Sequence, residues 1–102
     1  PDLVLPRFHA AIFVNGCFWH RHDCHLFKMP STRTDFWSQK IERNAARDAI
    51  VRGQLERAGW RYVIVWECAL KGRTRIGIDE VVARIAGWLR GSEPSLEIEG
   101  AR

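Results

Sequence analysis

The chain has 102 residues, of which 46% are hydrophobic and 27% are charged, and its formal net charge is +4. This composition excludes a disordered tail, and no apolar run approaches the roughly 20 residues of a membrane-spanning helix. Three cysteines, an odd number, and the lack of a signal-peptide pattern argue against a secreted disulfide framework and favour a reducing cytoplasm. We expect one domain over residues 1–102, and its positive charge favours a polyanionic partner.

Two short β-prone runs open the chain, Asp2 to Leu5 and Ala10 to Val14. The proline at position 6 between them predicts a hairpin whose two strands pair. Because the chain begins with Pro1 and not with methionine, we expect that an N-terminal segment precedes it in the whole protein.

The next segment, Cys17 to Lys28, has no periodicity and is rich in histidine, cysteine and aromatic residues, so we expect an irregular loop. Three thiolates and an imidazole suit tetrahedral zinc, and with no open position the site would be structural. The proposed ligands are Cys17, His22, Cys24 and Cys68. His20 and His25 compete with His22 as the fourth ligand, and spacing alone does not choose among them. Small buried hydrophobic cysteines are the alternative interpretation.

A long helix is predicted from about Thr34 to Ala58. Thr32 followed three residues later by Asp35 indicates a capped start, and Gly59 indicates the end. Spacings of four and three define one stripe that should face the sheet. Its members are Trp37, Ile41, Asn44, Asp48, Val51, Leu55 and Ala58.

Two members of that stripe are polar and need partners or a wet cleft, because burying an unpaired amide or carboxylate costs about 1 to 3 kcal/mol. For Asp48 we favour a buried ion pair or a structural hydrogen bond. For Asn44 we favour a place beside a ligand, because it lies near Trp37 and Lys40.

Trp60 to Trp66 is rich in β-branched and aromatic residues and predicts a buried strand that delivers Glu67 and Cys68 at its end. A final helix is expected from about Ile78 to Leu89. Residues 90–102 have only a weak pattern, and we expect a tail there.

Over roughly residues 1–73 the chain resembles the very-short-patch-repair (Vsr) endonucleases, which nick DNA beside a T·G mismatch. Two long and chemically unusual strings carry the resemblance, Ile12-Phe13-Val14-Asn15-Gly16-Cys17-Phe18-Trp19-His20 and Ile64-Val65-Trp66-Glu67-Cys68-Ala69-Leu70. Shorter matches are Pro1-Asp2, Cys24, Leu26-Phe27-Lys28, Thr32-Arg33-Thr34, Phe36-Trp37, Lys40-Ile41, Asn44, Arg47-Asp48 and Gly59-Trp60-Arg61.

The resemblance implies an α/β restriction-endonuclease-like core, a mixed sheet flanked by helices, with zinc held by the family residues that match Cys17, His22, Cys24 and Cys68. It also implies that Asp2 and the main-chain carbonyl of Val14 bind Mg²⁺. His20 matches the family histidine that accepts a proton from the attacking water, a role that an imidazole can fill near neutral pH. The family commonly has threonine-histidine where this chain has Val14-Asn15, and that histidine contacts the reacting phosphate region.

For DNA recognition, Phe18, Trp19 and Trp37 resemble aromatic residues that the family inserts beside the mismatch, and Lys40 and Asn44 resemble residues that approach base edges. Trp60, Trp66 and Trp88 have no such match and are expected in the core. A set of helix and loop arginines either contacts phosphates or is simply solvated. These are Arg33, Arg43 and Arg47.

The sequence therefore predicts a Mg²⁺-dependent, strand-specific DNA mismatch endonuclease that leaves a 5′-phosphate and a 3′-hydroxyl. We expect it to act as a monomer in the bacterial cytoplasm, associated with the nucleoid and with mismatch-repair proteins as further partners. One alternative is a zinc-stabilised DNA-binding relative that has lost catalysis, motivated by Val14-Asn15. Another is a restriction or mobile-element nuclease of the same fold with a different target.

Overall fold

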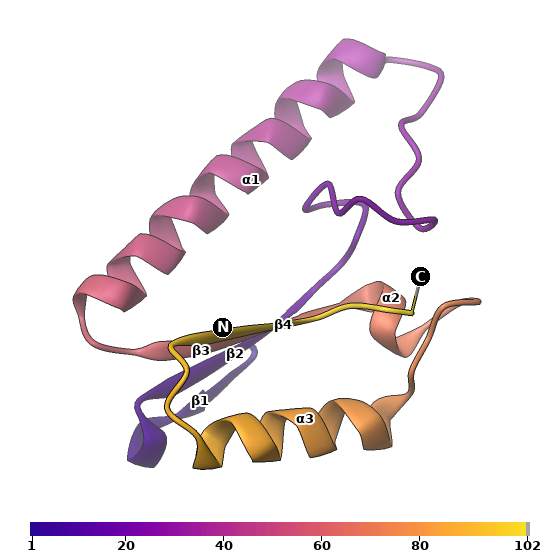
Figure 1. Cartoon of the computed structure of the whole chain (residues 1–102). Coiled ribbons are helices and arrows are strands. Elements are labelled where there is room, and N and C mark those ends of the chain that lie inside the picture. The colour runs from indigo at the N-terminus through magenta and orange to yellow at the C-terminus, as the bar shows by residue number, and fades with distance from the viewer. Residues whose placement is uncertain (102) are drawn as a thin grey trace.

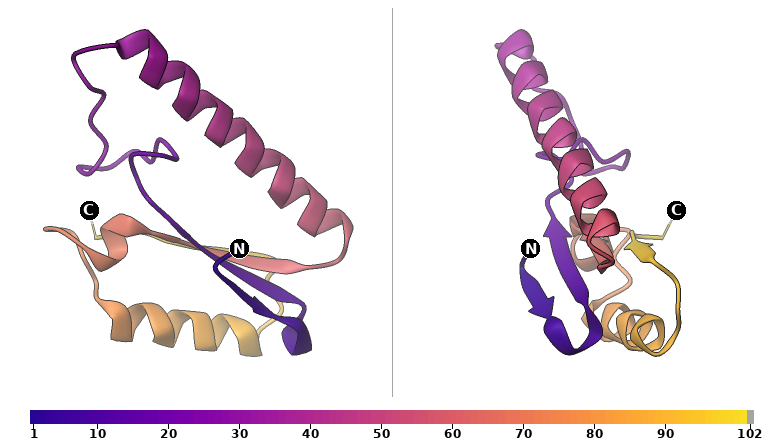
Figure 2. Two further views of the ribbon diagram at one scale, coloured as in Figure 1. Left: turned by 180° about the vertical axis from the view of Figure 1, so that it is seen from behind. Right: turned by 90° about the vertical axis from the view of Figure 1, so that its left-hand side faces the viewer.

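A computed structural model describes residues 1–101 of the chain. In chain order the elements are strand β1 (Leu3–Leu5), the 3-10 turn η1 (Pro6–Phe8), strand β2 (Ala10–Asn15), helix α1 (Thr34–Arg57), strand β3 (Arg61–Trp66), the short helix α2 (Glu67–Leu70), helix α3 (Ile78–Arg90) and strand β4 (Ser95–Ile98). The strands form one mixed sheet in the order β1-β2-β3-β4. Figure 1 shows α1 over one face of this sheet and α3 under the other, and Figure 2 repeats that layering from two further sides.

The predicted hairpin is confirmed, because β1 pairs antiparallel with β2. Pro6 begins the intervening turn, and His9 closes it with φ 48° and a hydrogen bond from its N–H to the Pro6 carbonyl at 3.0 Å. β2 and β3 are parallel, with Asn15 opposite Trp66 at their carboxyl ends, and α1 makes the crossover between them. This connection brings the two segments that follow the strands, at residues 16 and 67 onward, to the same edge of the sheet.

The core divides into two clusters, one on each face of the sheet. Between the sheet and α3 lie alternate strand residues, one residue of α2 and two side chains of α3, namely Ala10, Ile12, Val63, Val65, Ala69, Val81, Trp88 and Ile98. On the α1 face lie Cys17, Tyr62, Ile64, Trp66 and Cys68, against which Leu55 packs. The expectation that Trp66 and Trp88 belong to the core is confirmed, whereas Trp60 is half-buried and stacks on His9.

Helix α1 has the predicted bounds to within a residue, but its capping differs from the prediction. Arg33 precedes the helix with φ 53° and no side-chain cap, and the hydroxyl of Thr34 donates to the Pro30 carbonyl at 3.1 Å. The predicted Thr32 cap is therefore wrong. The helix ends as predicted, because Gly59 takes φ 78° and the Trp60 N–H bonds back to the Leu55 carbonyl at 2.9 Å.

Only part of the predicted α1 stripe faces the sheet. Leu55 packs on the sheet cluster, but the side chains nearer the helix start meet the loop at residues 16–33, which Figure 1 shows beside the upper half of the helix. Ile41 is the fully buried member, and Ala58 is exposed. The loop therefore fills the space that the sequence pattern assigned to the sheet.

The prediction that residues 90–102 form a tail is wrong, because they contain a strand of the sheet. Residues Ser95–Ile98 form β4, which pairs parallel with β3, and Ile98 is completely buried. The preceding helix α3 and this strand return the chain to the sheet edge beside β3 (Figure 1).

Candidate active site and metal centre

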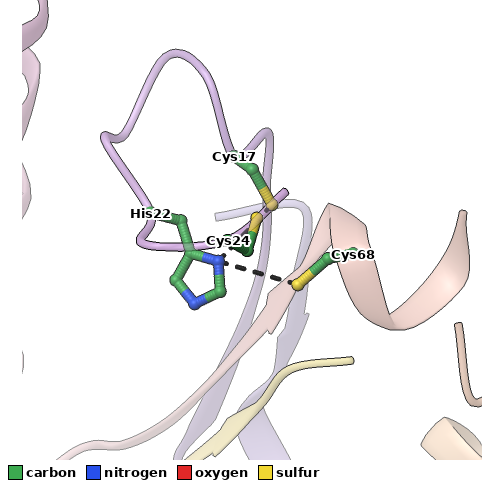
Figure 3. A group of neighbouring side chains, drawn as sticks. All are labelled: Cys17, His22, Cys24 and Cys68. Atoms are coloured by element: carbon green, nitrogen blue, oxygen red, sulfur yellow. Dashed lines mark hydrogen bonds between the residues drawn. The ribbon is translucent and has the colours of Figure 1, made fainter. Parts of the chain in front are cut away.

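The four predicted metal ligands lie together at the carboxyl ends of β2 and β3. Cys17 and Cys68 each follow two residues after the last paired residue of their strand, so the parallel register brings the two thiols together. His22 and Cys24 come from the loop that turns back over them (Figure 3). The four ligand atoms all lie within 4.8 Å of one another.

The geometry of this cluster fits a tetrahedral ion. His22 Nδ1 lies 3.6 Å from Cys17 Sγ and 3.6 Å from Cys68 Sγ. Zinc bonds of about 2.3 Å to sulfur and 2.0 to 2.1 Å to nitrogen give ligand separations of about 3.5 Å in a tetrahedron. Burial raises the pKa of the Cys17 thiol to about 12, so a cation is needed to hold a thiolate there at neutral pH. The donor set and its spacing therefore match a closed, structural metal site.

Cys24 differs from Cys17 in its surroundings. Burial acts to raise the pKa of Cys24, but hydrogen bonds from the Leu26 backbone and the His22 ring outweigh it and lower that pKa. Cys24 is thus the cluster thiol whose surroundings already favour the anion, which a metal ligand must become.

Among the three histidines that competed for the fourth position, His22 is the one in the cluster. His25 Nδ1 lies 3.4 Å from the Thr74 hydroxyl, and His20 turns toward α1. The backbone helps to fix the loop, because the Cys17 N–H donates to Glu67 Oε1 at 3.1 Å and the His22 N–H donates to the Cys17 carbonyl at 2.9 Å.

A second group of interest lies where β1 begins beside β2. The N–H of Val14 donates to Asp2 Oδ2 at 2.6 Å, and the N–H of Asp2 donates to the Ile12 carbonyl at 2.9 Å. N–H and C=O groups of one strand residue point to the same edge and alternate along the strand. The carbonyls of Ile12 and Val14 therefore point to the same edge of β2, the edge that faces β1. The Asp2 carboxylate lies at this edge, just before β1 begins. The Asp2 carboxylate and the Val14 carbonyl thus lie at one edge of β2, where both could serve as oxygen ligands of a hard cation.

His20 forms a pair that sequence reasoning did not assign to it. Its Nδ1 contacts Asp48 Oδ2 across the space between the loop and α1, and both side chains are about one quarter exposed. Asp48 therefore has the hydrogen-bond partner that we expected for it, and this partner, His20, is a candidate catalytic group. A carboxylate at Nδ1 holds that proton and leaves Nε2 with a free lone pair.

Asn15 lies close to this pair. Its side chain is buried at 8% exposure and lines a pocket of about 80 Å³ together with Asp48 and Arg47. Asp2 accepts a hydrogen bond from Val14, the residue before Asn15, so three of the four predicted catalytic residues lie at the carboxyl end of β2.

The predicted DNA-contacting aromatic residues form one cluster. Phe18 lies 5.2 Å from Trp19 and 5.7 Å from Trp37 between ring centroids, and Trp19 lies 5.7 Å from Trp37. Trp19 is 43% exposed, and Phe36 extends the cluster on the helix side at 44% exposure. Phe18 and Trp37 are half-buried beside these two exposed rings, so the group differs from a core packing cluster and is a candidate contact surface.

Polar groups surround this aromatic cluster. Lys40 Nζ lies 5.5 Å from the Trp19 ring centroid, and the Arg33 guanidinium lies 4.4 Å from that of Phe36. The Asn44 amide donates to the Trp19 carbonyl at 3.1 Å, so Asn44 has a structural hydrogen bond as well as a place at the cluster. Arg43 and Arg47 are exposed on α1.

Comparison with known proteins agrees with this arrangement. Residues 1–26 match the family model described as DNA mismatch endonuclease Vsr. Over 99 residues, 97% of the chain, the sequence is 44% identical to the DNA mismatch endonuclease Vsr of Escherichia coli. The chain is thus similar to Vsr over nearly its whole length. It is also 47% identical over 69% of its length to the type II nicking enzyme V.XorIIP of Xanthomonas oryzae, and 41% identical over 72% to V.NmeAIP of Neisseria meningitidis.

The chain spans 64% of the length of the Escherichia coli Vsr and 52% of each of the two nicking enzymes. The matched region includes the loop, α1 and the strands that carry the candidate Vsr site. Across residues 1–101, no helix is both long enough and apolar enough to cross a membrane.

Proposed function

We propose that the chain is a Mg²⁺-dependent, strand-specific DNA endonuclease that nicks beside a T·G mismatch in very-short-patch repair. The observation that carries this proposal is the pairing of His20 with Asp48 at the same end of β2 as the Asp2 carboxylate. The Vsr and nicking-enzyme relatives support the same reaction class.

The metal-binding part of the site consists of Asp2 and the Val14 carbonyl. Mg²⁺ prefers oxygen ligands and keeps several waters, so one carboxylate and one carbonyl suffice. When bound, the ion would offset negative charge that develops on the phosphate. The main-chain carbonyl supplies its oxygen whatever side chain occupies position 14, so valine is compatible with this role.

The proton-transfer part consists of His20 and Asp48. Asp48 accepts the Nδ1–H of His20, and Nε2 then takes a proton from the water that attacks phosphorus in line. The bond between phosphorus and the 3′ oxygen breaks, and that oxygen takes up a proton from solvent water, which leaves a 5′-phosphate and a 3′-hydroxyl. Asp48 stabilises the imidazolium that forms, as a carboxylate beside a positive charge does.

Asn15 stands where the family commonly has a histidine. Its amide donates hydrogen bonds but carries no positive charge, so it orients a phosphate oxygen without the electrostatic part of that interaction. Asn15 is buried beside Asp48, where it supplies no positive charge to the site. This observation supports a second candidate function, a DNA-binding relative that binds without nicking.

The cysteine and histidine cluster is proposed to hold a structural Zn²⁺ through Cys17, His22, Cys24 and Cys68. A closed set of three thiolates and one imidazole leaves no position for substrate. The ion would fix the loop that carries His20 and the aromatic residues.

DNA recognition is assigned to the exposed aromatic cluster. Phe18, Trp19 and Trp37 are proposed to enter the base stack beside the mismatch, where a T·G wobble is cheaper to unstack than a normal pair. Lys40 and Asn44 carry donors suited to base-edge acceptors.

We further propose that residues 1–102 form one domain with a restriction-endonuclease-like core. The mixed sheet with helices on both faces supports that assignment. The protein would work on double-stranded DNA as a monomer in the bacterial cytoplasm at the nucleoid, together with mismatch-repair proteins.

The first test uses end-labelled duplexes, one T·G mismatched and one fully paired, with and without Mg²⁺, resolved on a denaturing gel. Nicking of only the T-containing strand, and only with Mg²⁺, is the expected result. Binding without a nick would favour the DNA-binding relative, and equal cutting of both duplexes would indicate a nuclease with a different target.

His20→Ala should retain DNA affinity and lose nicking by about 100-fold or more, because general-base catalysis contributes that much. Gel-shift titration and single-turnover nicking measure the two quantities separately. His25→Ala, which changes a loop histidine away from the Asp48 pair, is the matched control. A fully active His20→Ala protein would remove His20 from the mechanism.

A further inference from the structure

The segment that follows β4, residues 99–101, lies against the cysteine and histidine cluster. This contact joins parts of the chain that are far apart, because Glu99 is 77 residues from His22 and Gly100 is 32 residues from Cys68. Figure 1 shows the end of β4 running beside α2, where Cys68 lies. The region that the sequence pattern assigned to a tail thus reaches the site.

Glu99 contacts the ring nitrogen of His22 that faces away from the thiols. His22 Nε2 lies 2.9 Å from Glu99 Oε2, while Nδ1 lies 3.6 Å from both Cys17 Sγ and Cys68 Sγ. In a neutral imidazole one ring nitrogen carries a proton, and this N–H can donate a hydrogen bond to a carboxylate. Glu99 therefore keeps the proton on Nε2 and leaves the lone pair of Nδ1 directed at the metal position.

Gly100 makes the second contact. Its N–H donates to Cys68 Sγ at 3.3 Å, in a position to stabilise a thiolate. A Cβ at this residue would lie 2.5 Å from the Cys68 carbonyl oxygen and 2.5 Å from the Thr74 hydroxyl, so only glycine fits this close approach. The next residue holds the segment in place, because the Ala101 N–H donates to the Thr74 carbonyl at 2.8 Å.

We propose that Glu99 and Gly100 position two of the metal ligands, so that the segment after β4 sets the zinc affinity of a site whose ligands lie between residues 17 and 68. This inference rests on the proposed Zn²⁺ cluster. Glu99 is a positioning residue: it orients His22 and fixes its tautomer without binding the metal. Gly100 supplies the backbone donor to Cys68.

A cavity borders the cluster on this side. It has a volume of about 340 Å³ and is lined by His22, Cys24 and Cys68 together with Glu99 and Gly100. The segment after β4 therefore forms part of the wall of the space next to the ligands.

The test measures Zn²⁺ affinity by competition with a chromophoric chelator for the parent protein, Glu99→Ala and Glu99→Gln. Glu99→Ala should weaken affinity about 10- to 100-fold, as loss of such partners does at other metal sites. Glu99→Gln keeps an acceptor of the same shape and should restore part of that loss. The matched control is Glu97→Ala, which removes an exposed carboxylate two residues earlier on β4.

Co²⁺ loading provides the second readout. The visible absorption of tetrahedral thiolate-bound Co²⁺ should be the same in the parent and Glu99→Gln, because the four ligands are unchanged, while Co²⁺ affinity falls. Glu99→Ala with the same affinity as Glu97→Ala would overturn the inference. A folded parent protein that binds neither Zn²⁺ nor Co²⁺ would instead overturn the zinc assignment itself.

Discussion

Individual side chains in this chain derive their roles from partners that are distant in sequence. The three cysteines of the proposed metal site could be proposed from the sequence because thiols and imidazoles have few other reasons to gather at short spacing, but spacing did not choose among the three histidines. The Asp48 partner of His20 was not readable, since the two residues are 28 positions apart and helical periodicity says only that Asp48 lies on the inner side of α1. The contact between Glu99 and His22 could not be predicted for the same reason, because the two residues are 77 positions apart. The sequence suggested the proposed ligands and the proposed base, and the tertiary structure added the neighbouring groups that we propose to orient them.

Asp48→Asn should lower the nicking rate by at least about 100-fold with DNA affinity unchanged. An asparagine amide can donate to Nδ1 and so favour the tautomer with its proton on Nε2, which cannot accept a proton from water. The measurement is the single-turnover rate beside a gel-shift titration.

Asp35→Asn is the matched control, because it changes an exposed carboxylate in the first turn of the same helix. If Asp48→Asn nicks as fast as this control, Asp48 has only a structural role.

Regular elements were predictable where their patterns were long. Helices α1 and α3 and strand β3 agree with the expected bounds to within one residue because each carries a sustained pattern or a clear end signal. Strand β4 was missed because four residues, Ser95–Ile98, give too short an alternation to distinguish a strand from a tail. Its stability comes from pairing with β3 and from burial of Ile98, neither of which is local.

Ile98→Ala should reduce the free energy of unfolding by about 2 to 5 kcal/mol, the usual cost of deleting a fully buried isoleucine side chain to alanine. Urea denaturation in the presence of Zn²⁺ measures it. Glu97 on the same strand is exposed, so Glu97→Ala should change the free energy of unfolding by less than about 0.5 kcal/mol. Equal midpoints for the two variants would mean that β4 does not pack on the core.

At the scale of the whole molecule, one ion is expected to organise the part of the chain that lacks regular structure. Within the described residues 1–101, the segment 16–33 contains no helix or strand, yet it carries His20 and two of the four rings of the aromatic cluster, Phe18 and Trp19. Its position depends on Cys17, His22 and Cys24, all of which are ligands in the proposed zinc site. The sheet and the helices have their own apolar contacts and depend less on the ion.

Zinc removal should therefore expose this segment before it unfolds the sheet. After chelation, trypsin should cleave first at the exposed Arg21, Lys28 and Arg33, and mass spectrometry of the products identifies the sites. Protein kept in Zn²⁺ is the control and should resist cleavage there. Identical fragments and rates with and without chelator would contradict a structural role for the metal.

The pairing of β4 with β3 also has a consequence for biosynthesis. The ligands extend from Cys17 to Cys68, and the groups proposed to position them lie at Glu99 and Gly100. A ribosome emits the chain from its N-terminus, so the first thiols leave the exit tunnel long before the strand that completes their surroundings. If the proposed zinc site forms as described, tight metal binding and an ordered aromatic surface would follow only after residues up to about position 100 have emerged, and the proposed DNA cutting would begin only once the sheet is assembled.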